Sequence, residues 1–345
     1  MPKIMIALAT YQGAAFVRSQ IASIRRQSLE DWTLLVRDDG STDATVEIVR
    51  EMAARDRRIH LLQDERMHCG SAGNFAVLLQ RAYDLGADYV FLADQDDVWL
   101  ADKLRRQMDL LRHNEIAGGR RTPHLVYSDL VVVDRQLRTV HPSFFSHSRL
   151  RHGGPQPLRT FLGRSVVLGC ASALNRPLLE LALPLPASVP WHDWWIALCA
   201  AAVGSISCLP QPMLWYRRHG ANSSGPAGFW AGFNPWRYDW GKRWASGYDL
   251  FRQSLTQAMA LRSRLQERPV TVSEETQAYL ERFCAVFEHP QPAWRRIGQL
   301  LSMGIPAIDV PRRLLYYLCV SALPRQERIA LPPPALAEPV ARKAA

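Results

Sequence analysis

The most informative stretch of the sequence is Phe91-Leu92-Ala93-Asp94-Gln95-Asp96-Asp97-Val98-Trp99. An apolar strand pattern runs directly into three carboxylates, and each carboxylate raises the cost of ionising the others. A divalent cation removes that cost. Hard oxygen ligands suit Mg²⁺ or Mn²⁺, with a substrate diphosphate completing the coordination shell. The alternative is an acidic turn that caps the next helix, because Asp is a common N-cap residue.

Strand and helix patterns alternate around this stretch. Strand patterns are found at Lys3–Ala9, Trp32–Val36, Arg58–Leu62 and Tyr89–Ala93, and helix patterns at Ala14–Gln27, Thr42–Ala54, Ser71–Leu85 and Ala101–His113. This alternation predicts an α/β fold with a Rossmann-like, mostly parallel sheet covered by helices on both faces. Such sheets bind ligands at the carboxyl ends of their strands.

Two more of these strand ends carry polar side chains. The strand that ends at Val36 continues into Arg37-Asp38-Asp39-Gly40-Ser41-Thr42-Asp43. Asp38 or Asp39 can accept hydrogen bonds from a nucleobase or ribose, and Gly40 permits a tight turn. The alternative is a well-capped connection between strand and helix. The first strand ends in Ala9-Thr10-Tyr11-Gln12, which places a ring and polar groups at the same sheet edge.

The composition bounds the remaining possibilities. The 345 residues include 42 Lys and Arg against 32 Asp and Glu, a net charge of +10. Such an excess indicates an anionic partner: nucleic acid, a phosphorylated substrate or a membrane surface. The six cysteines include no C-x-x-C pair, which disfavours a zinc ribbon. The segment from Met1 to Ala7 lacks a signal-peptide pattern, so we expect a cytoplasmic protein.

From about residue 120 the pattern loosens. We expect strands at Leu125–Val133 and Val166–Leu174, then a buried helix at Trp191–Val203 that leads into a strand at Ile206–Tyr216. The uncharged run from Trp194 to Tyr216 is long enough to cross a bilayer, but Gly, Ser and Pro residues interrupt it. After Gly220 a Gly/Asn/Ser/Pro stretch marks a boundary. Residues 226–330 have a mainly helical pattern, and we expect residues 331–345 to be a disordered tail.

The strand ends, in this order and spacing, resemble those of family 2 glycosyltransferases, which have the GT-A fold. The matching blocks are Ala9 to Gln12, Asp38 to Asp43, Gly70 to Phe75, Asp94 to Trp99, Leu168 to Cys170, Trp191 to Trp195 and Tyr216 to Ser223, together covering about residues 1–225. The last two blocks resemble the bacterial branch that includes rhamnosyltransferases of surface-polysaccharide synthesis. The sequence departs from the family at Gln12 and at Met67-His68-Cys69, where Asn is common in both places.

The resemblance implies that residues 1–115 bind a nucleotide-sugar and that residues 116–225 hold the acceptor and the catalytic group. The implied donor-binding residues are Thr10, Tyr11, Gln12, Asp38, Asp39, Gly70, Asn74, Asp94, Gln95, Arg217 and Arg218. Asp94 and Asp96 would hold Mg²⁺ or Mn²⁺, with Asp97 a close alternative and His219 a further ligand. The metal would neutralise the diphosphate as it leaves. The branch resemblance favours dTDP-rhamnose as the donor and leaves UDP-sugars open.

An inverting transferase also needs a base. That base takes the proton of the acceptor hydroxyl as the hydroxyl attacks the anomeric carbon. Asp193 is the candidate, since it begins an apolar helix after Trp191-His192; the alternative is that it only caps this helix. The implied acceptor-binding residues are Gly169, Cys170, Trp191, His192, Trp194 and Trp195. The tryptophans either stack on sugar faces or belong to the core.

The C-terminal part is basic and aromatic. Seven aromatic residues lie between Phe229 and Trp244, with Arg237, Lys242 and Arg243 among them. This composition is typical of a membrane interface, of a surface that stacks on nucleic-acid bases, or of a helix-packing core. The segment from Val310 to Val320 begins with two arginines and is too short to span a bilayer. We hypothesise that the region docks on the cytoplasmic membrane face near a lipid-linked glycan acceptor.

Two other functions compete with the transferase. One is a sugar-nucleotide-binding scaffold that has lost catalysis, which the joint presence of Asp94, Asp96 and Asp193 disfavours. The other is a nucleic-acid-binding protein, but the sequence has no recognisable nucleic-acid-binding motif.

The loop with Gly220, Ser223 and Gly225 has the composition of a lid over the donor.

Overall fold

A nine-stranded sheet forms the centre of the computed structural model, which describes residues 2–148, 157–163, 165–219, 240–288 and 291–304. The strands are β1 (Ile4–Thr10), β2 (Thr33–Asp38), β3 (Ile59–Leu61), β4 (Tyr89–Asp94), β5 (Val98–Trp99), β6 (His124–Val133), β7 (Thr139–His141), β8 (Ser172–Asn175) and β9 (Ser205–Arg217). Their order is β3-β2-β1-β4-β8-β6-β9-β5, and β7 pairs with β6.

The first half of the sheet is parallel, as the sequence predicts. β1 pairs with β2 and β4 in parallel, and β2 pairs with β3. These strands are apolar over most of their length because helices cover both faces. The register aligns Thr10 with Asp38 and Ala9 with Asp94, so the polar ends of three strands meet at one sheet edge.

The second half of the sheet is mixed. β8 runs antiparallel to both β4 and β6, while β6 and β9 are parallel. β5 runs antiparallel to β9. The turn that follows β4 is therefore held by a strand more than 100 residues further along the chain. The predicted helix-to-strand run from Trp191 to Tyr216 is confirmed: helix α8 (His192–Val203) leads into β9. Among the described residues, no helix is long and apolar enough to cross a bilayer.

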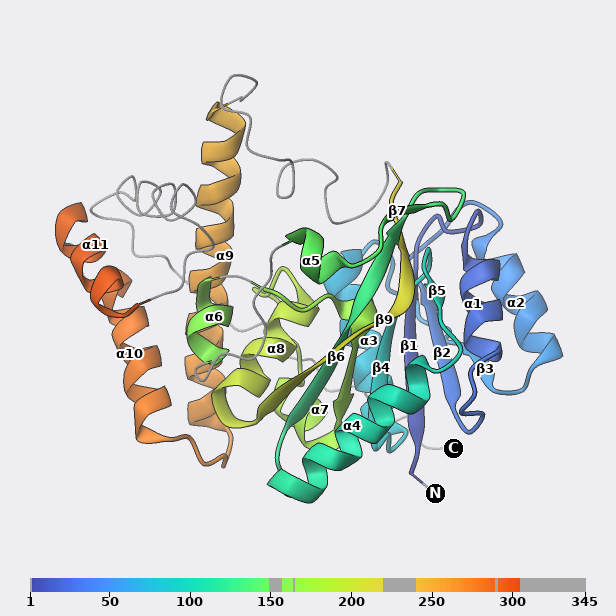
Figure 1. Ribbon diagram of the computed structural model, residues 1–345, viewed down its shortest axis with the longest axis horizontal. Coiled ribbons are helices and arrows are strands. Elements are labelled where there is room, and N and C mark those ends of the chain that lie inside the picture. Colours follow the sequence, from blue (N-terminus) through green and yellow to red (C-terminus); the bar gives the residue numbers. More distant parts are fainter. Residues whose placement is uncertain (1, 149–156, 164, 220–239, 289–290, 305–345) are drawn as a thin grey trace.

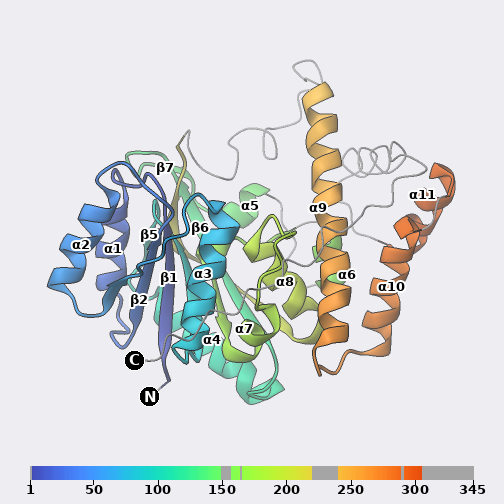
Figure 2. The ribbon, with the colours of Figure 1, turned by 180° about the vertical axis from the view of Figure 1, so that it is seen from behind.

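Helices cover both faces of the sheet (Figures 1 and 2). The other helices of the sheet domain are α1 (Val17–Arg25), α2 (Thr45–Arg55), α3 (Gly70–Asp84), α4 (Lys103–Gly118), α5 (Phe144–Ser148), α6 (Pro157–Gly163) and α7 (Arg176–Ala182). Figure 1 shows α4 in front of the sheet, and Figure 2 shows α3 and α7 on the opposite face. On α3, Phe75, Leu78, Leu79 and Ala82 follow the helical period and are fully buried.

The described residues of the C-terminal part form α9 (Trp240–Glu267), α10 (Glu274–Glu288) and α11 (Ala293–Ser302). The long α9 packs against α6 and α8 at the side of the sheet domain, and α10 packs on α9 (Figures 1 and 2). Leu255, Ala258 and Leu261 form the buried face of α9. The loop from Gly220 to Gly225, the aromatic side chains from Phe229 to Trp244, the segment from Val310 to Val320 and the tail 331–345 lie outside the described residues.

Candidate active site

A cavity of about 450 Å³ lies at the sheet edge where β1 and β4 end. Two segments that are far apart in the sequence face each other across it: the strand ends with the start of α3, and the start of α8 with the turn before β8. The lining residues are Ala9, Thr10, Tyr11, Asp39, His68, Gly70, Ser71, Asn74, Phe75, Asp94, Gln95, Asp96, Leu168, Gly169, Cys170, Trp191, His192, Asp193 and Tyr216. Most of the residues that the sequence singles out are therefore brought together here.

The carboxylate cluster sits at the end of β4. Asp94 and Asp96 line the cavity, whereas Asp97 is fully buried beneath it. Burial, together with the charges of Asp96 and Asp193, raises the pKa of Asp94 to about 7. Burial also raises the pKa of Asp97 well above its ordinary value, with Asp96 and Asp94 adding to the effect. The site thus holds more negative charge than it can stabilise alone.

This donor set fits a divalent cation. Oxygen atoms of Asp94 and Asp97 and the Cys170 sulfur lie within 4.8 Å of one another. Nε2 of His219 lies 2.8 Å from Oδ2 of Asp96, and its ring stacks on Phe16. Clustered carboxylates with an imidazole are ligands that Mn²⁺ and Mg²⁺ accept, and a cation relieves the repulsion among the carboxylates.

A buried lysine lies under the cluster, and sequence reasoning missed it. The Lys103 ammonium donates to Oε1 of Gln107 at 2.9 Å and lies 3.9 Å from the centroid of the Trp99 ring. Burial lowers the pKa of Lys103 to about 7, and the nearby Cys170 and Asp97 oppose that shift. The helical period could have predicted this burial, because Lys103 and Gln107 fall on the same face of α4 as the buried Leu104, Met108 and Leu111.

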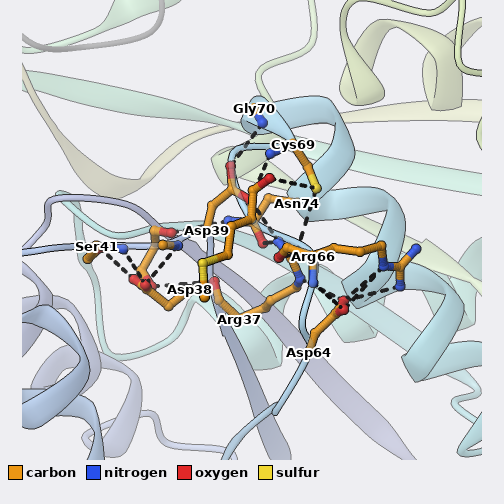
Figure 3. Close-up of polar contacts among 12 residues, drawn as sticks. Arg37, Asp38, Asp39, Ser41, Asp64, Arg66, Cys69, Gly70 and Asn74 are labelled. Atoms are coloured by element: carbon orange, nitrogen blue, oxygen red, sulfur yellow. Dashed lines mark hydrogen bonds and ion pairs between the residues drawn. The ribbon is translucent and has the colours of Figure 1, made fainter.

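A second buried cation, Arg37, organises the neighbouring part of the same wall, at the end of β2 and the start of α3 (Figure 3). Arg37 is fully buried and pairs with Asp39 at 3.1 Å and with Asp64 at 3.2 Å. It also donates to Oδ1 of Asn74 at 3.1 Å. Asp39 in turn accepts the backbone N–H groups of Cys69 (3.0 Å) and Gly70 (2.9 Å), which orients the N-terminus of α3 toward the cavity. Arg37 was not predicted from the sequence as a site residue. The one indication in the sequence is that a charged residue lies within a strand, directly after its apolar residues.

Asp38 and Gln12 belong to the turn beside the cavity and do not line it. Asp38 accepts hydrogen bonds from the hydroxyl of Thr10 at 2.9 Å and from the backbone N–H of Ser41 at 2.7 Å. Gly40 follows with a φ of 92°, a conformation that glycine adopts without strain. Gln12 donates to the hydroxyl of Thr42 at 2.9 Å. In the sequence, Asp38 and Asp39 were equal candidates; the structure brings Asp39 alone to the cavity.

Gln95 connects the first strand end to the carboxylate cluster. Its side chain accepts from the Tyr11 backbone N–H at 2.8 Å and donates to the Tyr11 carbonyl at 2.7 Å. Tyr11 itself is 47% exposed and lines the cavity. The middle residue of the Asp94-Gln95-Asp96 turn thus fixes the loop after β1.

Asp193 lies on the wall that faces the cluster. Its Oδ2 accepts the Gly169 N–H at 3.0 Å, and its Oδ1 accepts the N–H of Trp194 at 2.7 Å. Helix α8 begins at His192 with Trp191 as its N-cap residue, so Asp193 is not the cap. The two backbone donors fix the carboxylate, which remains partly accessible from the cavity.

His192 is buried next to Asp193 and stacks on Phe75 with ring centroids 3.8 Å apart. Neither ring nitrogen has a hydrogen-bond partner among the described residues. Burial lowers the pKa of His192, which keeps the imidazole neutral at neutral pH. A Cβ atom on Gly169 would lie 2.9 Å from Nε2 of His192, so a side chain at this position would have to displace the stacked His192 ring.

Several predicted site residues lie behind the cavity, and these are corrections. Trp194 and Trp195 are 2% and 0% exposed, and their indole N–H groups bind the carbonyls of Phe161 and Ala182. Neither ring can stack on a sugar there, whereas Trp191 does line the cavity. Arg217 is also buried, and its guanidinium braces the cluster by donating to the Asp96 carbonyl at 2.8 Å. Arg218 and His219 are partly buried and are not among the residues that line the cavity, but His219 stays next to the cluster through its contact with Asp96.

Comparison with known proteins places this arrangement in a family. Residues 5–175 match the family model "Glycosyl transferase family 2". The chain is 35% identical over 210 residues to an Escherichia coli UDP-Glc:alpha-D-GlcNAc-diphosphoundecaprenol beta-1,3-glucosyltransferase, covering 59% of this chain and 73% of that protein. It is 32% identical over 108 residues to a Shigella flexneri dTDP-rhamnosyl transferase, covering 31% and 37%. The chain belongs to glycosyltransferase family 2.

Solved structures confirm the GT-A fold. The chain superposes on Staphylococcus aureus TarS 1-349, determined with UDP-GlcNAc, with a TM-score of 0.52 and 14% identity, over 92% of this chain and 81% of that one. A mannosyltransferase from Pyrobaculum calidifontis, determined with GDP-Man and Mn²⁺, gives a TM-score of 0.50 and 16% identity over 91% and 78%. The matched part of the chain spans 66% of the length of another relative, a Nostoc glycosyltransferase, and 37% of the length of the Shigella protein.

Proposed function

We propose that the protein is a cation-dependent, inverting glycosyltransferase that moves a sugar from a nucleotide diphosphate to a glycan hydroxyl. One observation carries the proposal: Asp94 and Asp96, at and just after the end of β4, line the same cavity as Asp193, in the first turn of α8. A transferase needs both parts, a charge site for the leaving diphosphate and a carboxylate to accept the hydroxyl proton.

The donor would lie along the wall built by β1, β2 and α3. Asp39 and Thr10 offer acceptors to the nucleoside, and the N-terminus of α3 at Gly70 favours an anionic phosphate. Asp94 and Asp96, with His219 beside Asp96, would hold Mg²⁺ or Mn²⁺, which when bound would supply positive charge to the leaving diphosphate. Arg217 would keep the carboxylate turn in place through its bond to the Asp96 carbonyl.

Asp193 would be the base. Its two backbone hydrogen bonds leave the carboxylate oriented toward the cavity, where an acceptor hydroxyl can deliver its proton to an oxygen of Asp193. The hydroxyl oxygen bonds to the anomeric carbon as the bond from that carbon to the diphosphate oxygen breaks. A base on the face opposite the leaving group gives inversion, as in inverting glycoside hydrolysis.

The relatives suggest the chemical class of the substrates. Their names specify UDP-glucose with a GlcNAc-diphosphoundecaprenol acceptor in one case and a dTDP-rhamnosyl donor in another. We therefore propose dTDP-rhamnose or a UDP-sugar as the donor and a surface-polysaccharide or lipid-linked glycan as the acceptor. The enzyme would work on the cytoplasmic side of the membrane as a peripheral protein, and its basic surface would favour anionic lipid.

The test is a transfer assay with purified protein. It combines UDP-glucose, UDP-GlcNAc and dTDP-rhamnose with synthetic lipid-linked GlcNAc diphosphate and Mn²⁺ or Mg²⁺, with EDTA as a control. We expect metal-dependent release of nucleoside diphosphate that Asp96→Ala abolishes. Binding of donor without any turnover under all conditions would support the inactive scaffold instead. The absence of any donor-induced rise in melting temperature would contradict both functions.

A further inference from the structure

Helix α9 reaches from the C-terminal part to the wall of the active-site cavity. Trp191 lines that cavity, and its indole Nε1 donates a hydrogen bond to Oε1 of Gln253 on α9 at 3.0 Å. The two residues are 62 positions apart in the sequence. Because the bond is partly buried, water competes less with it than at an open surface.

A set of hydrogen bonds places α9 against the segment that leads to Trp191. Arg264 of α9 is 6% exposed and donates to the carbonyls of Leu181 (2.6 Å), Leu183 (2.9 Å) and Pro184 (2.6 Å). These carbonyls lie at the end of α7 and just after it, where a helix leaves its last acceptors unpaired. Arg268 donates to the Leu183 carbonyl at 2.8 Å. The guanidinium groups therefore hold the chain between α7 and α8.

The packing of α9 also fixes Gln253 itself. The neighbouring Ser254 donates its hydroxyl to the carbonyl of Leu162 in α6. Leu255, Ala258 and Leu261 are fully buried against the sheet domain. With both sides of this contact held in this way, the position of the Gln253 amide relative to the Trp191 indole is well defined.

We propose that Gln253 is a positioning residue that orients the Trp191 indole for acceptor binding, which makes α9 part of the acceptor site. This proposal rests on the proposed function, since Trp191 has an acceptor sugar to contact only in a glycosyltransferase. An indole that is held by its N–H keeps one orientation at the cavity. Without that bond the ring samples other rotamers, and acceptor binding must then pay for ordering it.

The first experiment measures the ring directly. In protein labelled with 5-fluorotryptophan, the ¹⁹F resonance of Trp191 is identified by its loss in Trp191→Phe. We expect Gln253→Leu to shift or broaden this resonance, because Leu removes the acceptor while keeping a similar volume. Gln253→Glu keeps an oxygen acceptor for the indole N–H, now on a carboxylate, and should preserve the resonance. Gln266→Leu, at an exposed position of the same helix, is the matched control and should change nothing.

The second experiment uses UDP-glucose with a synthetic GlcNAc diphosphate that carries an undecyl chain. For Gln253→Leu we expect the acceptor KM to rise about tenfold, with kcat and the donor KM within about twofold, because one hydrogen bond to a binding residue is lost. Gln253→Glu should restore the acceptor KM. Melting temperatures of the variants should agree within about 2 °C, which excludes general loosening of the fold.

Two results would overturn the proposal: a Trp191 resonance that is unchanged in Gln253→Leu, or an acceptor KM that stays at the wild-type value. If the wild-type protein shows no turnover with this donor and acceptor, the proposed function fails for that pair. The ¹⁹F spectra of the wild type and the four variants still decide whether Gln253 orients the ring.

Discussion

The two walls of the cavity are held together in different ways. The wall formed by β1, β2, β4 and α3, which we propose binds the donor and call the donor wall, joins Thr10, Asp39 and Asn74 from the first 75 residues. Arg37 binds Asp39 and Asn74, and the Asn74 amide donates to the Thr10 carbonyl. The facing wall, with Gly169 and Trp191 to Asp193, is held by the Asp193 carboxylate, by the Trp191 indole N–H and by the Arg264 guanidinium of α9, which binds the Leu181 carbonyl. The donor wall is thus set by adjacent strand ends, and the facing wall by packing between distant elements.

If the facing wall supplies the base, changing Asp193 should have the largest effect. Asp193→Asn changes the size of the side chain little and keeps one oxygen that can accept a backbone N–H. The amide cannot take a proton from a hydroxyl. We expect kcat to fall by about 10²–10⁴-fold, as for loss of a general base, while UDP binding with Mn²⁺ is unchanged. Steady-state kinetics with titration calorimetry measure both. A variant that keeps more than half of the wild-type kcat would place the base elsewhere.

Changes in the donor wall should act mainly by lowering the stability of the fold. Arg37→Met leaves the buried Asp39 carboxylate without its cation, and breaking a buried pair in this way destabilises a protein by about 3–5 kcal/mol. Urea unfolding measures the change. Arg18→Met is the control, since Arg18 pairs with Glu51 at an exposed surface and its loss should leave the urea midpoint nearly unchanged. Equal midpoints for the two variants would show that Arg37 is not the centre of this wall.

The carboxylates at the end of β4 predict a pH dependence. Because the folded-state pKa of Asp94 is raised to about 7, this group is largely protonated at pH 6 and must lose its proton to hold a cation. Affinity for Mn²⁺ with UDP should therefore rise about tenfold between pH 6 and pH 8, which calorimetry at fixed ionic strength measures. Asp94→Asn should bind more weakly and with a flatter pH profile. A wild-type affinity that falls as pH rises would contradict this assignment.

The smallest effect is expected at the link between the donor wall and the cluster. Gln95→Ala removes both hydrogen bonds to the Tyr11 backbone at an exposed site, each worth about 0.5–1.5 kcal/mol at most. The donor KM should rise several-fold with little change in kcat. Gln80→Ala, which removes an exposed bond to Asp84 on α3, is the control and should leave both constants unaltered. An unchanged donor KM in Gln95→Ala would show that the Tyr11 loop does not contact the donor.

The same contrast explains what the sequence could predict. The donor-wall strands end in conspicuous polar runs, and parallel register alone brings Thr10, Asp38 and Asp94 to one edge. Local pattern could not separate Asp38, which closes a turn, from Asp39, which meets the buried Arg37, because that choice depends on a contact with α3. Family membership was predictable since its blocks are short and ordered along the chain.

The facing wall was harder to predict. Trp191, Trp194 and Trp195 look alike in the sequence, yet one lines the cavity and two bind carbonyls in the core. The direction in which each ring points is set by α6, α7 and α9, and no local pattern encodes that packing. The strand expected at Val166–Leu174 is in fact the short β8, which covers only Ser172–Asn175 and follows a 3-10 turn at Gly169–Ala171. Its antiparallel direction could not be predicted, because no local pattern encodes the direction in which a strand pairs.

The bond from Arg217 to the carbonyl of Asp96 has a consequence for synthesis on the ribosome. It joins residues 121 positions apart, and His219 meets Asp96 across 123. The parallel half of the sheet can form while the chain is still emerging, since its contacts are closer in sequence and domains fold from the N-terminus onward. The carboxylate turn acquires its brace only after β9 has been made. A nascent chain should therefore bind Mn²⁺ with UDP only once residue 219 has left the exit tunnel, which stalled chains of increasing length would reveal.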